Sequence, residues 1–196
     1  MATELKDYIK TYDSVFTKDF CAATIEAFSK SESEYIDRGQ QPAFHHLNIS
    51  KKYMNKDPLW MGIQAQMSQN VAHVIEKYVN ELEVGPDMPR SYGFEEFRMK
   101  KYENNEYDQF KDHVDVGDYG SAIRFMVIFI YLNDVEEGGE TIFPKLDLKI
   151  KPECGKVLIF PPHWQYRHAG LPPVSNDKYI AGTYLHYSNQ EMTISV

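Results

Sequence analysis

Apolar side chains recur at three- and four-residue steps after Asp57-Pro58, and this pattern predicts one long helix with a single apolar stripe. The aspartate can cap the first turn, and proline suits the first helical position because it lacks the N–H that would be unpaired there. Gly85-Pro86 is predicted to end the helix. The stripe consists of Trp60, Ile63, Met67, Val71, Val74, Ile75, Tyr78 and Leu82.

A second helix is predicted nearer the start of the chain. The Thr17 hydroxyl can cap it, and Asp19 adds a negative charge in the first turn, where the helix dipole favours one. Its apolar positions are Phe20, Ile25 and Phe28. The polar residues 31–42 are then predicted to form a loop, so the first third of the chain is expected to be largely helical.

After Pro89 the pattern changes from helical to extended. The run at 123–132 (IRFMVIFIYL) is apolar, β-branched and aromatic, which favours a strand buried on both faces over the alternative of a buried helix. The other predicted strands are Phe94–Tyr102, Leu146–Ile150, Lys156–Phe160 and Lys178–Tyr187, separated by Gly, Pro, Asn and Asp.

Helices followed by antiparallel strands are typical of an α+β fold in which the helices pack on one sheet. Many short strands with turn residues between them favour a jelly-roll or cupin-like barrel, a double-stranded β-helix. We therefore expect a single domain over residues 1–196. Residues 1–90 would be mainly helical support, and residues 91–196 would form the jelly-roll core.

Composition limits the classes of function. With 196 residues and 42% hydrophobic side chains, the chain can bury one core. A chain with a net charge of −8 lacks the broad basic surface that nucleic-acid binding requires, so no nucleic-acid partner is expected. Cys21 and Cys154, the only cysteines, favour a reducing compartment. The first residues contain no long apolar run, so we expect no membrane association and a cytoplasmic location. The oligomeric state is left open.

The segment His113-Val114-Asp115 carries the candidate chemistry. In an extended strand residues i and i+2 point to the same side, so His113 and Asp115 can reach one metal ion. Two histidines and one carboxylate form the facial triad of non-haem Fe(II) enzymes, which leaves coordination positions open. His168 is the preferred third ligand and His163 the competing one. Lys178 follows His168 by ten residues, where a cation can meet the far carboxylate of a dicarboxylate; the alternative is a solvated surface lysine.

Two longer segments carry a resemblance to a known family. YLNDVEEGGETIFP (131–144) and FPPHWQYRHAGLPPVSNDKYIAGTYLHY (160–187) are similar to the 2-oxoglutarate- and Fe(II)-dependent dioxygenases, in particular to small bacterial and viral prolyl 4-hydroxylases. The similarity runs from about Tyr102 to Tyr187. It implies hydroxylation of proline in a peptide or protein, as in procollagen-proline 4-dioxygenases, with release of succinate and CO₂. The implied cofactors are Fe(II), 2-oxoglutarate and O₂, with ascorbate as a reductant that the protein binds.

The resemblance also assigns roles to residues. His113, Asp115 and His168 match the iron ligands, which are the catalytic centre. Lys178 matches the partner of the 2-oxoglutarate C5 carboxylate, and the hydroxyls of Tyr102 and Tyr131 match those that bind the same co-substrate.

Three further residues are implied to face the prolyl substrate. They are Arg124, Tyr184 and His186, and Tyr184 stands where the family has a tryptophan. The segment between Tyr102 and His113 is slightly longer than is usual in the family and lacks its glycine. These two departures bear on the substrate pocket rather than on the iron chemistry.

Two other functions remain compatible with the sequence. The same iron centre can hydroxylate another residue or a small metabolite. A jelly-roll can also hold a metal without catalysis, as a structural or sensory module.

Overall fold

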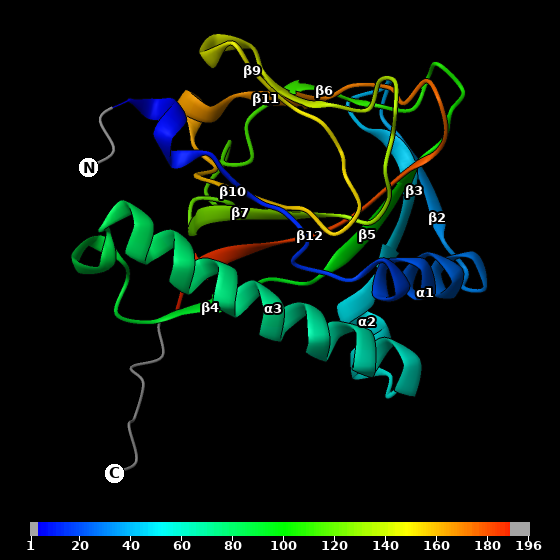
Figure 1. Ribbon diagram of the computed structural model, residues 1–196, viewed down its shortest axis with the longest axis horizontal. Coiled ribbons are helices and arrows are strands. Elements are labelled where there is room, and N and C mark those ends of the chain that lie inside the picture. The colour runs from blue at the N-terminus through cyan, green and yellow to red at the C-terminus, as the bar shows by residue number, and fades with distance from the viewer. Residues whose placement is uncertain (1–3, 189–196) are drawn as a thin grey trace.

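The computed structural model describes residues 4–188 and forms two facing β-sheets with helices on one side (Figure 1). The large sheet has eight strands in the order β1 (Lys10–Tyr12), β10 (Val157–Phe160), β7 (Arg124–Tyr131), β12 (Lys178–Tyr187), β5 (Arg98–Tyr102), β3 (Ala43–Asn48) and β2 (Glu34–Asp37), with β4 (Tyr92–Phe94) also pairing with β12. The small sheet has the order β6 (Phe110–His113), β11 (His168–Gly170), β8 (Thr141–Phe143) and β9 (Leu148–Ile150).

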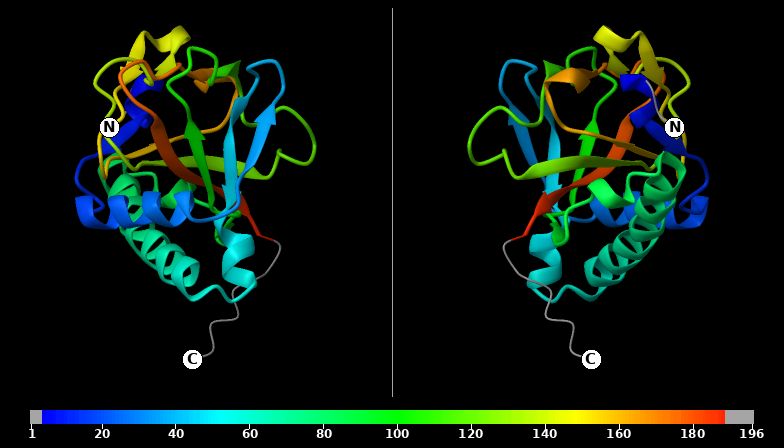
Figure 2. Two further views of the ribbon diagram at one scale, coloured as in Figure 1. Left: turned by 90° about the vertical axis from the view of Figure 1, so that its right-hand side faces the viewer. Right: turned by 90° about the vertical axis from the view of Figure 1, so that its left-hand side faces the viewer.

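Antiparallel pairing joins the strands of both sheets, for example β12 with β7 and β11 with β6. In Figures 1 and 2 the small sheet lies above the large one, and the helices cover the opposite face of the large sheet. Two facing antiparallel sheets with helices on one side are the α+β double-stranded β-helix that the sequence predicts.

The helices begin where the sequence places their caps. Helix α1 (Lys18–Ser29) starts after Thr17, whose Oγ1 accepts a hydrogen bond from the Phe20 N–H at 3.2 Å. Helix α3 (Pro58–Leu82) starts after Asp57, whose carboxylate accepts from the N–H groups of Leu59 and Trp60. Both helix predictions are confirmed. A shorter helix, α2 (Ile49–Met54), was not predicted. Four 3₁₀ turns complete the helical elements: η1 (Leu5–Tyr8), η2 (Gly85–Asp87), η3 (Pro144–Leu146) and η4 (Trp164–Tyr166).

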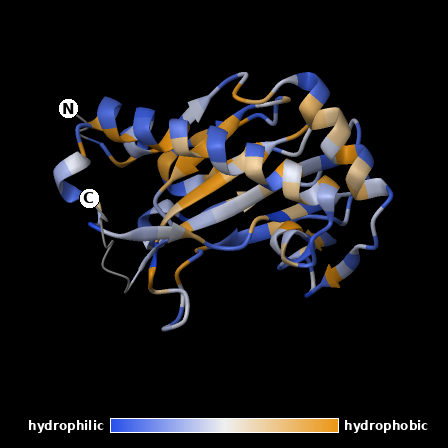
Figure 3. Ribbon diagram, turned by 90° about the horizontal axis from the view of Figure 1, so that it is seen from below, coloured by the Kyte–Doolittle hydropathy of each residue, from blue (hydrophilic) through white to orange (hydrophobic). Residues whose placement is uncertain are grey.

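The apolar stripe of α3 packs on the large sheet and forms the main core. All eight predicted stripe residues are buried, and they meet Met126, Ile128 and Ile130 of β7. Each such aliphatic side chain contributes roughly 1.5–3 kcal/mol when it is removed from water. Figure 3, viewed from the helix side, shows hydrophilic segments along the helices and hydrophobic strands behind them.

The first ninety residues do more than supply helices. Strands β1, β2 and β3 lie within them and extend the large sheet at both edges. The loop prediction for residues 31–42 is wrong over Glu34–Asp37, which form β2. This strand is mostly exposed and polar, so it has no alternating pattern to reveal it. Its backbone pairs with β3, a second strand that was not predicted.

The later strands are confirmed with changed bounds. Phe94–Tyr102 is not one strand, because β4 ends at Phe94 and β5 begins at Arg98. The predicted strand at Leu146–Ile150 is shorter by two residues, and β12 has the predicted bounds. Within residues 4–188, no helix combines the length and the apolar character needed to cross a membrane.

Candidate metal centre and the pocket around it

Two neighbouring strands of the small sheet deliver the three candidate ligands. Strand β6 ends at His113 and β11 begins at His168, and the two histidines face each other in the antiparallel register. Asp115 lies two residues beyond the end of β6. The prediction that His113 and Asp115 share one extended strand is therefore wrong in detail, because the strand ends at His113 and the chain bends at Asp115.

The bend still brings the three side chains together. Nε2 of His113 lies 3.7 Å from Oδ1 of Asp115, and Nε2 of His168 lies 3.5 Å from Oδ2. One ligand atom from each residue lies within 4.8 Å of the others. Among the described residues this is the one cluster of histidine, cysteine and acidic side chains that can hold a metal ion.

Backbone carbonyl groups orient both imidazole rings. Nδ1 of His113 lies 2.8 Å from the Lys111 carbonyl oxygen, and Nδ1 of His168 lies 3.1 Å from that of Tyr166. A carbonyl oxygen can only accept, so each Nδ1 carries the proton and each Nε2 offers a lone pair to the centre. The Phe110 ring stacks on His113 with ring centroids 3.7 Å apart, which further fixes that imidazole.

The charge states of the centre suit a divalent cation. Burial lowers the pKa of His168 to about 4 despite the nearby Asp115 charge, so this imidazole is neutral at pH 7. Burial would raise the pKa of Asp115, but its contacts with His113, His168 and Tyr184 outweigh burial and lower that pKa to about 2. The centre thus offers a neutral imidazole from His168 and a carboxylate from Asp115, with the His113 ring beside them.

Two atoms of the centre have no hydrogen-bond partner within the described part of the chain. They are Oδ2 of Asp115 and Nε2 of His168, and both are buried. Buried acceptors without a donor destabilise a fold, and a metal ion would supply the missing partner. Two nitrogen donors and one oxygen donor fit Fe(II) with open coordination positions.

The structure also decides between the two candidate third ligands. His163 is exposed and precedes the 3₁₀ turn η4, whereas His168 is 2% exposed and lies beside Asp115. The choice of His168 over His163 therefore agrees with the geometry.

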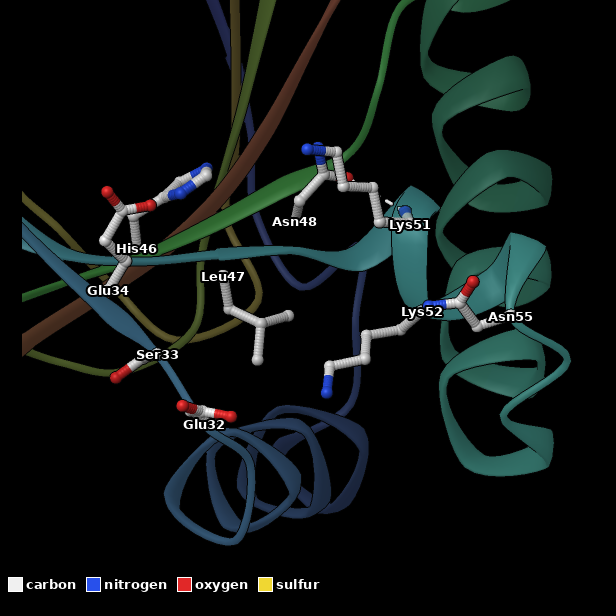
Figure 4. A pocket seen from close by; sticks show the side chains of 9 residues that line it. All are labelled: Glu32, Ser33, Glu34, His46, Leu47, Asn48, Lys51, Lys52 and Asn55. Atoms are coloured by element: carbon white, nitrogen blue, oxygen red, sulfur yellow. Dashed lines mark hydrogen bonds between the residues drawn. The ribbon is translucent and has the colours of Figure 1, made fainter.

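The candidate ligands line one end of a narrow pocket between the two sheets. Strand β5 contributes Lys100 and Tyr102, and β12 contributes Lys178, Ile180 and Tyr184. The remaining walls are Phe110, Phe129, Thr141 and Gly170. A more open groove lies between β3 and α2 (Figure 4), where Lys52 and Glu32 point into the same space. That groove contains charges of both signs and no metal-binding cluster.

Lys178 lies deep in the narrow pocket. It is 2% exposed, and its Nζ lies 5.4 Å from the centre of the Tyr102 ring and 5.7 Å from that of Tyr131. Within residues 4–188 it forms no ion pair with a carboxylate. Burial, together with the charge of Lys100, lowers the pKa of Lys178 to about 7, although Glu140 opposes the shift. Lys178 is thus a buried lysine, protonated below about pH 7, and not a surface lysine.

The two predicted tyrosines stand on either side of this lysine. Tyr131 donates a hydrogen bond to Oγ1 of Thr141 at 2.7 Å. Burial raises the pKa of both Tyr102 and Tyr131, so both hydroxyls keep their protons. Thr141 has no distinguishing signal in the sequence, since its partner lies on another strand of another sheet.

Arg124 and Tyr184 contact the candidate ligand Asp115. The Tyr184 hydroxyl donates to Oδ1 of Asp115 at 2.8 Å, and Nη1 of Arg124 donates to its backbone carbonyl at 3.2 Å. The Arg124 guanidinium lies 4.0 Å from the centre of the Tyr184 ring and forms a two-pronged ion pair with Glu95 at 2.7 and 2.9 Å. Glu95 lies between β4 and β5 and was not predicted as a site residue.

His186 lies apart from the pocket. A register shift in the pairing of β12 with β7 falls between Leu185 and His186. Opposite β4, His186 pairs with Gly93, and its Nδ1 lies 3.0 Å from the Tyr187 carbonyl oxygen. The structure therefore groups Arg124 and Tyr184 with the metal centre and leaves His186 outside it.

Known proteins share this fold and parts of this sequence. "Probable prolyl 4-hydroxylase 9" of Arabidopsis thaliana is 31% identical over 129 residues, which are 53% of this chain and 44% of that protein. The chain spans about half the length of the curated relatives it matches.

Two solved structures match most of the chain. Viral collagen prolyl hydroxylase from Paramecium Bursaria Chlorella virus-1, solved as a 2OG complex, has a TM-score of 0.65 and 21% identity over 93% of this chain and 97% of its own. A Trichoplax adhaerens prolyl hydroxylase in complex with a peptide of hypoxia inducible factor has a TM-score of 0.72 and 14% identity over 91% of this chain and 83% of its own. At these identities the likeness shows the fold.

A family model links the sequence to this fold. Residues 97–186 match the model of the 2OG-Fe(II) oxygenase superfamily, and the match includes all three candidate ligands and Lys178. The match confirms the oxygenase assignment made from the sequence. Over residues 97–186, this chain is similar to the 2OG-Fe(II) oxygenase superfamily.

Proposed function

We propose that the protein is an Fe(II)- and 2-oxoglutarate-dependent dioxygenase that hydroxylates proline in a peptide or protein, with release of succinate and CO₂. His113, Asp115 and His168 would hold the iron. The observation that carries the proposal is the pair of buried, unpartnered atoms, Oδ2 of Asp115 and Nε2 of His168, which lie beside the buried cation of Lys178 in one pocket.

The pocket also suits the co-substrate. The ammonium of Lys178 would pair with the C5 carboxylate of 2-oxoglutarate, because no carboxylate among the described residues occupies it. The hydroxyls of Tyr102 and Tyr131 would donate to the same carboxylate. Tyr131 now donates to Thr141, so it would exchange or share that hydrogen bond.

Iron and 2-oxoglutarate together would supply the oxidising power, drawn from O₂, to replace an unactivated C–H bond with C–OH. The protein's own residues fix the ligands and keep water out. Phe110 and Phe129 wall the pocket, and Tyr184 and Arg124 hold Asp115 in place. No general acid or base is needed, so the pocket needs no catalytic triad.

Proline is proposed as the target because of the relatives. Proteins similar to this chain are named prolyl 4-hydroxylases, and one solved structure of the same fold contains a peptide. Four points stay predictions from the sequence. They are a single domain, ascorbate as reductant, a cytoplasmic location and a substrate role for His186.

The test is a hydroxylation assay on an array of prolyl peptides with Fe(II), 2-oxoglutarate and O₂. We expect succinate to form with a product heavier by roughly 16 Da, the mass of one oxygen atom. Turnover of free proline or of a non-prolyl metabolite, with no turnover of peptides, would contradict the proposal.

A binding measurement tests the metal assignment separately. Anaerobic addition of Fe(II) and 2-oxoglutarate is expected to produce a weak visible charge-transfer band. The His113→Ala protein should lack the band. If it retains the band at full intensity, His113 is not a ligand.

A further inference from the structure

Lys100 is a second cation of the pocket and is separate from Lys178. It lies on β5 two residues before Tyr102, so both side chains point between the two sheets, while Met99 points to the helix-facing core. Its Nζ lies 4.8 Å from the centre of the Phe44 ring and 5.4 Å from that of Phe110. Within residues 4–188 it forms no ion pair.

A groove extends from the metal pocket past Lys100. It shares Lys100, Phe129, Ile180 and Tyr184 with that pocket and continues over Gly182 to Glu96 and Arg98. We call it the Gly182 groove. A Cβ atom at position 182 would lie 3.0 Å from the Ile128 carbonyl oxygen and 3.0 Å from the Phe129 ring. Glycine therefore leaves this part of the groove free of a side chain.

The charges along this groove are unequal. Arg98 is paired with Glu96, at 2.7 Å, and so contributes little net attraction. Lys100 has no such partner, and burial lowers its pKa to about 8, with Arg98 and Arg124 adding to the shift and Asp115 opposing it. A ligand that enters the groove therefore meets one uncompensated ammonium between aromatic walls.

The two lysines are placed for different ligands. Lys178, Tyr102 and Thr141 line the metal pocket but not the Gly182 groove. Lys100 lies where the pocket and the groove join. The charge of Lys100 disfavours the protonated form of Lys178, so a second anion at Lys100 would relieve the repulsion between them.

We propose that Lys100 determines substrate specificity by binding a carboxylate of the substrate in the Gly182 groove, next to the carbon that is hydroxylated. The proposal rests on the proposed function. The carboxylate is either an acidic side chain near the target proline or the C-terminal carboxylate of a short substrate. Both bring the same charge to Lys100.

The test compares peptides that differ by one charge. A glutamate is moved through the three positions on each side of the proline, with glutamine as its uncharged counterpart, and each peptide is made as the free acid and as the amide. We expect one acidic position, or the free C-terminus, to raise kcat/KM about tenfold, as one partly desolvated charge pair does. The position identifies the source of the carboxylate.

The matched variants are Lys100→Met and Lys101→Met. Methionine keeps an unbranched apolar stem and removes the charge that lies over the rings of Phe44 and Phe110. Lys101 lies on the opposite face of β5, where it pairs with Glu103 and Asp177 at 3.0 Å. We expect Lys100→Met to abolish the preference for the acidic peptide and Lys101→Met to retain it. At pH 6, where Lys178 is mainly protonated in both proteins, both should keep the wild-type KM for 2-oxoglutarate.

Two results would overturn the proposal. One is equal kcat/KM for every acidic and neutral pair in the wild type. The other is a Lys100→Met protein that keeps the preference but has a raised KM for 2-oxoglutarate, which would assign Lys100 to the co-substrate.

An anaerobic measurement separates this proposal from the proposed function. Fluorescence anisotropy of labelled peptides on the protein loaded with Fe(II) and 2-oxoglutarate reports binding without turnover. If no prolyl peptide is hydroxylated, the proposed function fails. Tighter binding of an acidic peptide that depends on Lys100 would still support the carboxylate site, and equal binding would refute it.

Discussion

The two faces of the large sheet are made from alternate residues of the same strands, yet they are filled by different chemistry. On β7, Ile128 and Ile130 face the helices and join an aliphatic core. Their neighbours Phe129 and Tyr131 face the small sheet and belong to an aromatic cluster. The inner face carries the buried Lys178 and faces His168 of the small sheet and the carboxylate of Asp115, which stable cores normally exclude.

This difference separates stability from chemistry within one sheet. The helix-facing side removes apolar surface from water and sets the free energy of unfolding. The inner side holds charges and unpartnered acceptors, which lower that free energy but create a site for ligands. Substitutions on the helix-facing side should therefore change the free energy of unfolding, and substitutions on the inner side should change ligand binding and catalysis.

The largest effect on chemistry is expected at Asp115. Asp115→Ala should lower succinate production by at least about a thousandfold, because the only anionic ligand is lost. The free energy of unfolding without metal should change little, since the unpartnered Oδ2 is removed too. The control is Asp112→Ala, whose exposed carboxylate pairs with Arg167. If both variants lose activity equally, the loss is not a ligand effect.

The largest effect on stability is expected on the helix side. Met67 on α3 is fully buried against the large sheet. Met67→Ala should lower the free energy of unfolding by about 2–5 kcal/mol, as measured by urea denaturation. The remaining folded protein should keep the wild-type KM for 2-oxoglutarate. A raised KM at a temperature where the variant is folded would mean that the two faces are not independent.

Lys178→Met should do the opposite of Met67→Ala: it should weaken 2-oxoglutarate binding and raise the free energy of unfolding. Without the ammonium, the KM for 2-oxoglutarate should rise about a hundredfold at pH 6. Wild-type stability increases as the pH rises from 7 towards 10, because the unfolded chain holds the lysine proton and the folded chain releases it. The methionine variant should be more stable than the wild type at pH 7, and urea denaturation measures this. A less stable variant would indicate that the Lys178 charge supports the fold.

The same lysine predicts a pH dependence of co-substrate binding. Burial lowers the pKa of Lys178 to about 7, so the ammonium is present below pH 7 and is lost above it. A bound dicarboxylate raises this pKa, so the KM for 2-oxoglutarate should rise by up to about tenfold per pH unit above pH 7. In Lys178→Met the KM should not vary with pH over this range. A wild-type KM that is constant from pH 6 to 9 would contradict the assignment.

The smallest of these effects is expected at Tyr184. Tyr184→Phe removes the hydrogen bond to Oδ1 of Asp115 and keeps the ring on which Arg124 packs. Loss of such a partner of a metal ligand should weaken Fe(II) binding about tenfold. Anaerobic titration with Fe(II) measures this. Tyr187→Phe, on the exposed end of β12, is the control and should bind iron as the wild type does.

The sequence predicts elements whose signal is local. Helix α3 and strand β12 have strong patterns and clear flanking residues, so their bounds agree with the structure. Strands β1 and β2 are short and hold their place through backbone pairing, β1 with the distant segment Val157–Ile159 and β2 with Ala43–His46 across a short connection. No periodicity within three or four residues can reveal such pairing.

The same limit applies to the site. The spacing of His113 and Asp115 and the position of His168 are visible in the sequence, because the ligands follow a motif. The partners that hold them are not. Glu95 contacts Arg124 from 29 residues away, and Tyr184 contacts Asp115 from 69 residues away. In the sequence Lys100 looks like an ordinary strand lysine. Only the structure shows that its side of β5 lies between the two sheets.

Strand β1 has a practical consequence for work with shortened forms of this chain. Its three residues pair with Val157–Ile159 of β10, a strand whose four side chains are all buried and apolar. Removing the N-terminal segment would leave β10 as an open apolar edge, which recruits strands from other molecules. A fragment limited to residues 97–186 should therefore form intermolecular β-sheet and aggregate, even though it retains every candidate ligand of the metal centre.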